Sequence, residues 1–273
     1  MAALPGKGRR VALVLGSGGA RGLAHIGVIE HLTALGFDIR YIAGSSMGAL
    51  VGGIYAAGKL ETYAEWACRL QRRDILGLLD LAFGLQGLFK GDRIIAELKD
   101  LTGDRNIEDL DVGFTAVATD IYDQREIWLN RGPLFDAIRA SIAMPTVFTP
   151  HRYMGRVMVD GGLLNPVPIA PALNQDADLI VAVTLNGKHE TALEPSAGLS
   201  GSAGSDLPGI FDLVSMTVDT MQTSISRLKL AAYSPDVVIE IPRNVCTFYE
   251  FHKAAMLIEL GRERAEAVLG KAD

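Results

Sequence analysis

Short apolar runs alternate along this chain with longer segments in which apolar residues recur at helical spacing. The short runs are rich in valine and isoleucine and predict strands over residues 11–15, 39–43, 114–118, 157–159, 179–184 and 237–241. The longer segments predict helices over residues 20–35, 47–57, 61–70, 93–101, 134–142, 211–231 and 249–269. Strands that alternate with helices build a mostly parallel sheet. We therefore expect an α/β fold with a mostly parallel central sheet that is covered by helices on both faces.

The length and the segment boundaries indicate one domain. Gly36 and Gly58 stand where the first two helices should end, as left-handed caps. Residues 186–209 are rich in glycine, serine and alanine, which predicts a long mobile loop. A length of 273 residues is usual for one α/β layer protein. We therefore interpret residues 1–273 as a single domain that contains this loop.

Composition and charge exclude several classes of protein. Hydrophobic residues make up 49% of the chain and charged residues 21%, enough apolar material for a sizeable core. A formal net charge of -6, without a polybasic segment, gives no footprint for nucleic acid. No apolar run is long enough to span a bilayer. The run after Arg9 and Arg10 breaks at residues 16–19, too early for a signal peptide.

The two cysteines, Cys68 and Cys246, lie far apart and have no metal-ligating neighbours in the sequence. We interpret them as two buried thiols in a reducing compartment, so we expect no metal site. This predicts a cytoplasmic protein. Transient contact with the inner membrane surface stays open, and the sequence does not give the oligomeric state.

The first candidate for chemistry is the pentapeptide GSSMG at 44–48, between a predicted strand and a predicted helix. A serine at the apex of such a sharp turn exposes its hydroxyl at the top of the sheet. Gly44 and Gly48 flank it because the strand and the helix pass too closely for side chains. Ser46 is therefore the candidate nucleophile. The simpler interpretation of an isolated Gly-x-Ser-x-Gly match is a turn without chemistry.

A second glycine-rich segment, GSGGARG at 16–22, follows the first strand and opens the first helix. A dinucleotide fingerprint would need glycine or alanine in place of Arg21, and the phosphate-loop pattern needs a Gly-Lys-Ser/Thr ending that is absent. What remains is a row of backbone N–H groups at the positive end of a helix, which suits an oxyanion or a phosphate. The alternative is a tight glycine turn without a chemical role.

Acyl transfer by a serine also needs a proton acceptor, and two candidates stand out. Ser46, Asp160 and His252 reproduce the chain order of the α/β-hydrolase triad. Against this, His252 falls in a predicted helix rather than in a loop. Asp160 ends a predicted strand, where Gly161 and Gly162 let the chain turn away at once. A carboxylate can itself be the base if partial burial raises its pKa toward the working pH, so we favour Asp160 over His252. A turn-forming aspartate is the alternative.

Together these three motifs resemble the patatin-like phospholipase family. The glycine loop, the Gly-x-Ser-x-Gly turn and an Asp-Gly-Gly triplet roughly a hundred residues later stand in that family's order. The resemblance continues through SIAMP at 141–145 and LNPVP at 164–168, and it covers about residues 9–242. It is nearest to the compact bacterial members related to neuropathy target esterase. One departure is Ser17, where plant patatins carry glycine and the bacterial branch often has serine.

The resemblance implies a three-layer α/β/α fold and a serine hydrolase that needs no metal or cofactor. Ser46 would attack an acyl ester, and Asp160 would take its proton without a histidine. The N–H groups of Gly18 and Gly19 would hold the oxyanion. A lipid or lysolipid would be the substrate, and carboxylic esters of phospholipids or lysophospholipids would be cleaved through an acyl-enzyme.

Several other residues are candidates for supporting roles. Arg21 would either pair with a carboxylate that pins the loop or stabilise the anion directly. Asn165 and Arg139 would orient the dyad or contact the substrate. Trp66 and Trp128 are expected in the core or at an interface rather than in catalysis.

Residues 75–89 form an apolar stretch that is dense in leucine and aromatic residues and carries almost no charge. Buried packing over the mouth of the active site is one interpretation. The other is an acyl-chain pocket wall or a flap that touches lipid, because each methylene buried on an apolar surface contributes about 0.8 kcal/mol. Leu85 and Phe89 are the candidates for this contact.

Two other functions are compatible with the same residues. An acyltransferase would pass the acyl group to an acceptor other than water, and a catalytically silent regulator would keep the fold and bind lipid. The intact Ser46, Asp160 and glycine loop favour an active hydrolase.

Overall fold

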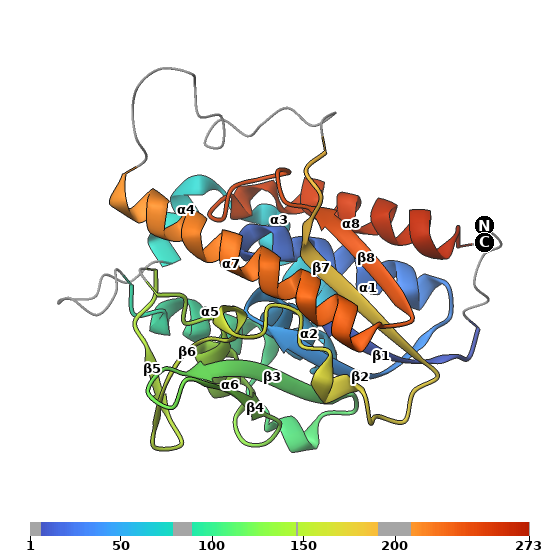
Figure 1. The fold of residues 1–273 in the computed structure, drawn as a ribbon, viewed down its shortest axis with the longest axis horizontal. Coiled ribbons are helices and arrows are strands. Elements are labelled where there is room, and N and C mark those ends of the chain that lie inside the picture. Colours follow the sequence, from blue (N-terminus) through green and yellow to red (C-terminus); the bar gives the residue numbers. More distant parts are fainter. Residues whose placement is uncertain (1–6, 79–88, 146, 191–208, 273) are drawn as a thin grey trace.

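The computed structural model describes residues 7–78, 89–145, 147–190 and 209–272. Within these ranges an eight-stranded sheet forms the centre of the molecule, in the order β5-β6-β3-β2-β1-β7-β8 with β4 paired to β3 outside this path (Figure 1). The strands are β1 (Arg10–Leu15), β2 (Asp38–Ser45), β3 (Gly113–Asp120), β4 (Arg125–Leu129), β5 (His151–Tyr153), β6 (Arg156–Asp160), β7 (Leu179–Gly187) and β8 (Val237–Pro242).

The sheet is mostly parallel, as predicted. Strands β3, β2, β1, β7 and β8 run parallel, whereas β4 and β6 are antiparallel to β3, and β5 is antiparallel to β6. All six predicted strands are present and extend a little beyond the predicted ends. β4 and β5 were not predicted: only three residues of β4, REIWL, are apolar and no valine is among them, and β5, HRY, contains no apolar run. Pairing with a neighbouring strand, rather than local sequence, defines them.

Helices cover both faces of the sheet. In β1, Val11, Leu13 and Leu15 belong to the larger of two apolar cores, and Ala12 and Val14 belong to the smaller one. The larger core takes residues from α1, α2, α3, α5, α6 and α8, and the smaller core packs against the end of α7. Figure 1 shows α7 on the near side of the sheet and α1 and α8 on the far side. The predicted three-layer α/β/α arrangement is thus confirmed.

The predicted helices are all present, although two of them begin late. A 3-10 turn, Gly19–Leu23, precedes the first helix, and another, Phe251–Lys253, precedes the last. Gly36 and Gly58 have φ angles of 77° and 71°, which confirms the left-handed caps. α4 was not predicted. The helices are α1 (Ala24–Ala34), α2 (Met47–Ala56), α3 (Leu60–Arg69), α4 (Arg72–Leu78), α5 (Asp92–Thr102), α6 (Leu134–Ser141), α7 (Ile210–Tyr233) and α8 (Ala254–Leu269).

The predicted loop at 186–209 begins later than the sequence indicates. β7 continues to Gly187, which pairs with Pro242 of β8 after a shift in register. Residues 186 and 187, the first two of the predicted loop, therefore belong to β7, because strand pairing continues past the apolar run. Residues 191–208 lie outside the described residues.

Membrane and metal features can be stated for the described ranges only. No helix there combines the length and the apolar character that crossing a bilayer requires. No cluster of histidine, cysteine or carboxylate side chains in the same ranges is arranged to hold a metal ion. Both cysteines are free thiols, and Cys246 is buried as predicted. The prediction of a buried thiol is wrong for Cys68, which is exposed because it lies outside the buried positions of α3, Tyr63 and Ala67.

Candidate active site

The site begins at the tight turn between β2 and α2. Ser46 occupies this turn with φ 55° and ψ -122°, a conformation that costs energy in a residue with a side chain. A Cβ atom on Gly44 would overlap the backbone at Gly48, and one on Gly48 would overlap the carbonyl of Leu15. Both glycines are thus required by the close passage of strand and helix.

Ser141, at the end of α6, holds the strained turn in place. The Ser46 N–H donates to Ser141 Oγ at 2.9 Å, and this hydroxyl donates in turn to the carbonyl of Val117 at 2.6 Å. Ser141 lies 95 residues from Ser46 in the sequence. The sequence showed it only as part of the SIAMP segment, with no signal for this contact.

Asp160 reaches the turn because two strands meet end to end. β2 pairs with residues 113–117 of β3, and β6 pairs with residues 118–120. β4 pairs with residues 116–120 and so occupies the opposite edge of β3 from both. β2 and β6 therefore share one edge of β3. Because β2 is parallel and β6 antiparallel to β3, their carboxyl ends meet there.

The two side chains are joined by a short hydrogen bond. Ser46 Oγ donates to Asp160 Oδ2 at 2.6 Å, and the Gly162 N–H donates to Asp160 Oδ1 at 2.7 Å. Asp160 is completely buried and Ser46 is 3% exposed. Burial raises the pKa of the Asp160 carboxyl to about 7, although both hydrogen bonds act in the opposite direction. A carboxylate with this pKa can exchange a proton with the serine hydroxyl near neutral pH.

The glycines after Asp160 allow the chain to leave the site. A Cβ atom on Gly161 would overlap the carbonyl of Val117, and one on Gly162 would overlap the side chain of Ser17. Gly162 thus packs directly on the glycine-rich loop. This contact joins the aspartate to the loop that follows β1.

The loop at 16–22 presents two backbone N–H groups that have no acceptor among the described residues. The N–H groups of Gly16, Ser17 and Ala20 donate to the carbonyls of Val183, Pro166 and Phe248. For Gly18 and Gly19 the structure gives no N–H acceptor within the described ranges. Gly19 has φ 56°, and a Cβ atom there would overlap the ring of Phe248. Gly19 and Ser46 line the same cavity.

This cavity has a volume of about 540 Å³ and a mostly apolar wall. The turn that carries Ser46 lines it, and α3, α4 and α5 contribute further lining residues. Its lining includes Leu23, Leu50, Trp66, Leu70, Ile75, Leu78, Phe89, Ile94, Leu98, Phe148 and Phe248. The predicted apolar stretch at 75–89 thus supplies part of the wall, through Ile75, Leu78 and Phe89. Residues 79–88, Leu85 among them, lie outside the described residues.

Neither histidine near the site contacts the Ser46–Asp160 pair in the described structure. His252 lines the cavity, where its Nε2 accepts a hydrogen bond from Arg72 Nε at 3.3 Å. His25 is buried, and its Nε2 donates to the carbonyl of Gly16 at 2.9 Å. Burial lowers the pKa of His25 to about 4, so it supports the glycine loop as a neutral ring. The sequence gave no signal for this role.

The expected supporting residues separate into two groups. Arg21 contacts the glycine loop, because its Nε donates to the carbonyl of Gly18 at 3.1 Å. Asn165 instead donates to Glu126 Oε2 at 2.7 Å, and Arg139 donates to the carbonyls of Lys90 and Thr149. The structure thus places Asn165 and Arg139 in contacts that brace the surroundings rather than in contact with Ser46 or Asp160.

The tryptophans also separate. Trp66 is partly buried against the larger core and lines the cavity, whereas Trp128 on β4 is 44% exposed. The core position is thus confirmed for Trp66, and an interface position for Trp128 stays a prediction.

Fold and site together define a three-layer α/β protein in which a strained serine that lines an apolar cavity meets a buried aspartate beside a glycine loop. The chain belongs to the patatin-like phospholipase family, whose model matches residues 13–173. This confirms the resemblance seen in the sequence. The family takes its name from phospholipases, which are lipid ester hydrolases.

Several curated proteins are similar to this chain. An uncharacterized NTE family protein of Mycobacterium tuberculosis is 38% identical over 95% of this chain and 91% of its own length. Two much longer animal proteins match 68% of this chain with 14% of their own length. They are patatin-like phospholipase domain-containing protein 7 of Rattus norvegicus, at 30% identity, and neuropathy target esterase sws of Drosophila melanogaster, at 31%.

Proposed function

We propose that this protein is a serine lipid acyl hydrolase that uses Ser46 and Asp160 as a catalytic dyad. The observation that carries the proposal is the 2.6 Å hydrogen bond to the buried Asp160 carboxylate from Oγ of Ser46, which lines an apolar cavity. Membership of the patatin-like phospholipase family supports a carboxylic ester of a lipid as the substrate.

In the first half of the reaction, Ser46 Oγ attacks the ester carbonyl carbon while its proton passes to Asp160 Oδ2. The tetrahedral oxyanion then accepts hydrogen bonds from the N–H groups of Gly18 and Gly19. Such donors act by being oriented before the charge develops. Collapse of the intermediate breaks the bond to the alcohol, which leaves with the proton held by Asp160, and an acyl-enzyme on Ser46 remains.

In the second half, water takes the place of the alcohol. Asp160, again a carboxylate, accepts a proton from the water as its oxygen attacks the acyl carbon. The bond between the acyl carbon and Ser46 Oγ then breaks, the proton held by Asp160 passes to Ser46 Oγ, and the fatty acid leaves. A base with a pKa of about 7 suits both halves, because it accepts and returns a proton near neutral pH.

The cavity supports a lipid rather than a polar ester as the acyl donor. Its wall is mostly apolar, and each methylene of an acyl chain that enters it would contribute about 0.8 kcal/mol. Phospholipids and lysophospholipids both carry such chains. We propose these as the substrate class.

Transient contact of a cytoplasmic protein with the inner membrane surface is the remaining part of the proposal. On α7, Leu213, Met216, Met221 and Leu228 are 50% to 68% exposed. Apolar side chains of this kind bind the boundary between headgroups and acyl chains. Changing Met216 and Met221 together to serine should lower co-sedimentation with phospholipid vesicles while sparing a short soluble ester. Unchanged sedimentation would remove α7 from this role.

The direct test of the nucleophile is labelling with a fluorophosphonate probe, followed by peptide mapping. The adduct is expected on Ser46 and absent from Ser46→Ala. Ser45→Ala is the matched control, because Ser45 is its neighbour and is completely buried. An adduct on Ser45 or Ser141 would refute the assignment. Incubation with a mixed lipid extract, with and without an added alcohol acceptor, then separates hydrolysis from acyl transfer.

A further inference from the structure

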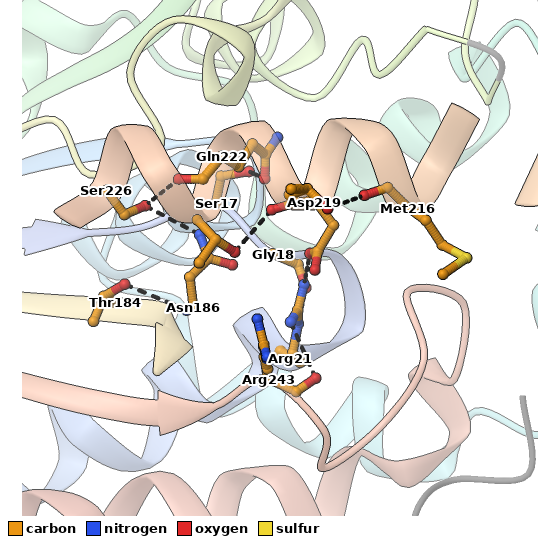
Figure 2. A network of polar contacts seen from close by, with 12 residues as sticks. Ser17, Gly18, Arg21, Thr184, Asn186, Met216, Asp219, Gln222, Ser226 and Arg243 are labelled. Carbon is orange, nitrogen blue, oxygen red and sulfur yellow. Dashed lines mark hydrogen bonds and ion pairs between the residues drawn. The ribbon is translucent and has the colours of Figure 1, made fainter. Parts of the chain in front are cut away.

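The inward face of α7 contacts the glycine loop at two points, which Figure 2 shows from close by. Arg21 Nη2 donates to Asp219 Oδ1 at 2.6 Å, and Ser17 Oγ donates to Gln222 Oε1 at 3.4 Å. Asp219 and Gln222 are three residues apart, so they lie on the same face of the helix. One helix, far away in the sequence, therefore holds both sides of the Gly18–Gly19 peptide.

Arg21 links this helix to the peptide itself. Its Nε donates to the carbonyl of Gly18 at 3.1 Å, and its Nη1 donates to the carbonyl of Arg243 at 3.1 Å. A guanidinium group is a flat, rigid fork, so an anchor on one nitrogen sets the direction of the others. The carboxylate of Asp219 thus helps to fix the N–H that binds Gly18.

The geometry of a peptide bond transmits this constraint one residue further. The Gly18 carbonyl and the Gly19 N–H belong to one planar trans peptide and point in opposite directions. Holding the carbonyl on Arg21 therefore aims the Gly19 N–H away from Arg21. Gly19 lines the cavity together with Ser46, where the oxyanion would form.

The loop needs such a constraint because it has no side chains of its own at this point. Glycine has more backbone freedom than any other residue, and Gly19 adopts a φ of 56°. Oxyanion donors act only when their direction is fixed in advance. The polar contacts to α7 supply a restraint that the glycines cannot.

The two partners of the Arg21–Asp219 ion pair differ in how deeply they are buried. The Arg21 side chain is 6% exposed and that of Asp219 is 40% exposed. Loss of the carboxylate would leave a buried guanidinium with two carbonyl partners and no ion-pair partner among the described residues, which favours its movement toward water. Because Asp219 is partly exposed, salt should weaken the ion pair and with it the restraint on the Gly18–Gly19 peptide.

Resting on the proposed hydrolase function, we propose that Asp219 is a positioning residue, which acts through Arg21 to orient the Gly19 N–H toward the oxyanion. Asp219 touches neither the substrate nor the reacting atoms. It couples the placement of α7 to the rate of acyl transfer at Ser46.

The test compares Asp219→Asn, Asp219→Ala and Asp219→Glu on a short soluble ester. Loss of one oxyanion donor costs about 10² to 10³ in kcat, so a misaligned donor should cost about tenfold or more. KM should change little, because only binding of the transition state is affected. The midpoint of the pH profile, which Asp160 sets, should not shift. Asp219→Glu should restore most of kcat. Hydrogen exchange of the peptide that spans residues 17–21 should be faster in the Asn and Ala variants.

Glu259→Gln is the matched control, since it removes one carboxylate from an ion pair with Arg262 on α8 and leaves α7 intact. It should keep wild-type kcat and loop exchange. A wild-type kcat in a folded Asp219→Asn protein would overturn the proposal, and so would a loss that Asp219→Glu does not repair. If turnover does not depend on Ser46, the proposed hydrolase function fails. The restraint on the loop is then tested by hydrogen exchange at residues 17–21 alone: faster exchange in Asp219→Asn and Asp219→Ala supports it, and unchanged exchange refutes it.

Discussion

The Ser46–Asp160 pair and the apolar cavity that Ser46 lines are built in different ways. Ser46 and Asp160 stand at the ends of two strands, are almost fully buried and are fixed by hydrogen bonds of 2.6 to 2.9 Å. The cavity wall comes from helices and connecting segments, and its side chains are mostly apolar and partly exposed. Sheet ends and strained turns give precise placement, whereas apolar walls tolerate changes in shape.

This difference in construction corresponds to two kinds of specificity, for the ester group and for the acyl chain. In the proposed mechanism the pair and the glycine loop act on the ester group, which all candidate substrates share. The cavity would hold the acyl chain, which differs between substrates. Changes to the pair should therefore affect every ester equally, and changes to the cavity should affect long chains selectively.

The largest effect is expected from the aspartate. Asp160→Asn keeps the shape of the side chain but removes the base, so kcat should fall by about 10² to 10⁴ on short and long esters alike. Steady-state kinetics on a series of esters would measure this. His252→Ala should cost little, because His252 contacts Arg72 rather than the pair. Equal losses in the two variants would restore the triad interpretation.

A smaller loss is expected at the glycine loop. Gly19→Ala places a methyl group against Phe248 and strains a left-handed residue, so the N–H should tilt. We expect kcat to fall by up to about 10² to 10³ and KM to change less, since the lost contact exists chiefly in the transition state. Gly58→Ala is the matched control, because Gly58 has a similar positive φ and a Cβ atom added there would meet no atom within 4 Å. A change in KM alone would indicate a site for a ground-state anion.

The pH dependence follows from the buried carboxyl. Only ionised Asp160 can accept a proton, and its pKa is raised to about 7, so the active form is lost as the pH falls through this value. Below it, kcat/KM should drop about tenfold per pH unit and should level off above it. The profile on a soluble ester measures this. A midpoint near 4 would mean that the base is an ordinary exposed carboxylate.

The smallest effect is expected in the cavity, and it should be selective. Ile94→Trp fills part of the wall on α5 and should exclude about two methylenes, which lowers kcat/KM for long-chain esters about tenfold and spares short ones. Leu101→Trp on the same helix is the control, because Leu101 packs against the core and does not line the cavity. Equal loss on all chain lengths would show that the cavity does not hold the acyl chain.

The sequence predicted the parts of this molecule that are local. Apolar runs identified the strands that form the sheet centre, and the glycine spacing around Ser46 and after Asp160 identified the turns. β4 and β5 escaped prediction because their pairing partners, and not their own residues, make them strands. The same holds for the contacts of Ser141 and Asp219, whose partners lie 95 and 198 residues away.

The cavity was predicted in part for a related reason. Residues 75–89 stood out by composition, but Trp66, Ile94 and Phe248 join them only when α3, α5 and the segment after β8 pack together. A helix that lines a cavity has the same apolar periodicity as one that packs on a core. Sequence alone cannot separate the two.

The central claim, acyl transfer through Ser46 and Asp160, is tested most directly by trapping the acyl-enzyme. Wild-type protein mixed briefly with a medium-chain ester and quenched in acid should carry one acyl group on the peptide that contains Ser46. Ser46→Ala should carry none, and Asp160→Asn should accumulate it far more slowly. Full turnover without acylated Ser46, or an acyl group on another residue, would contradict the account.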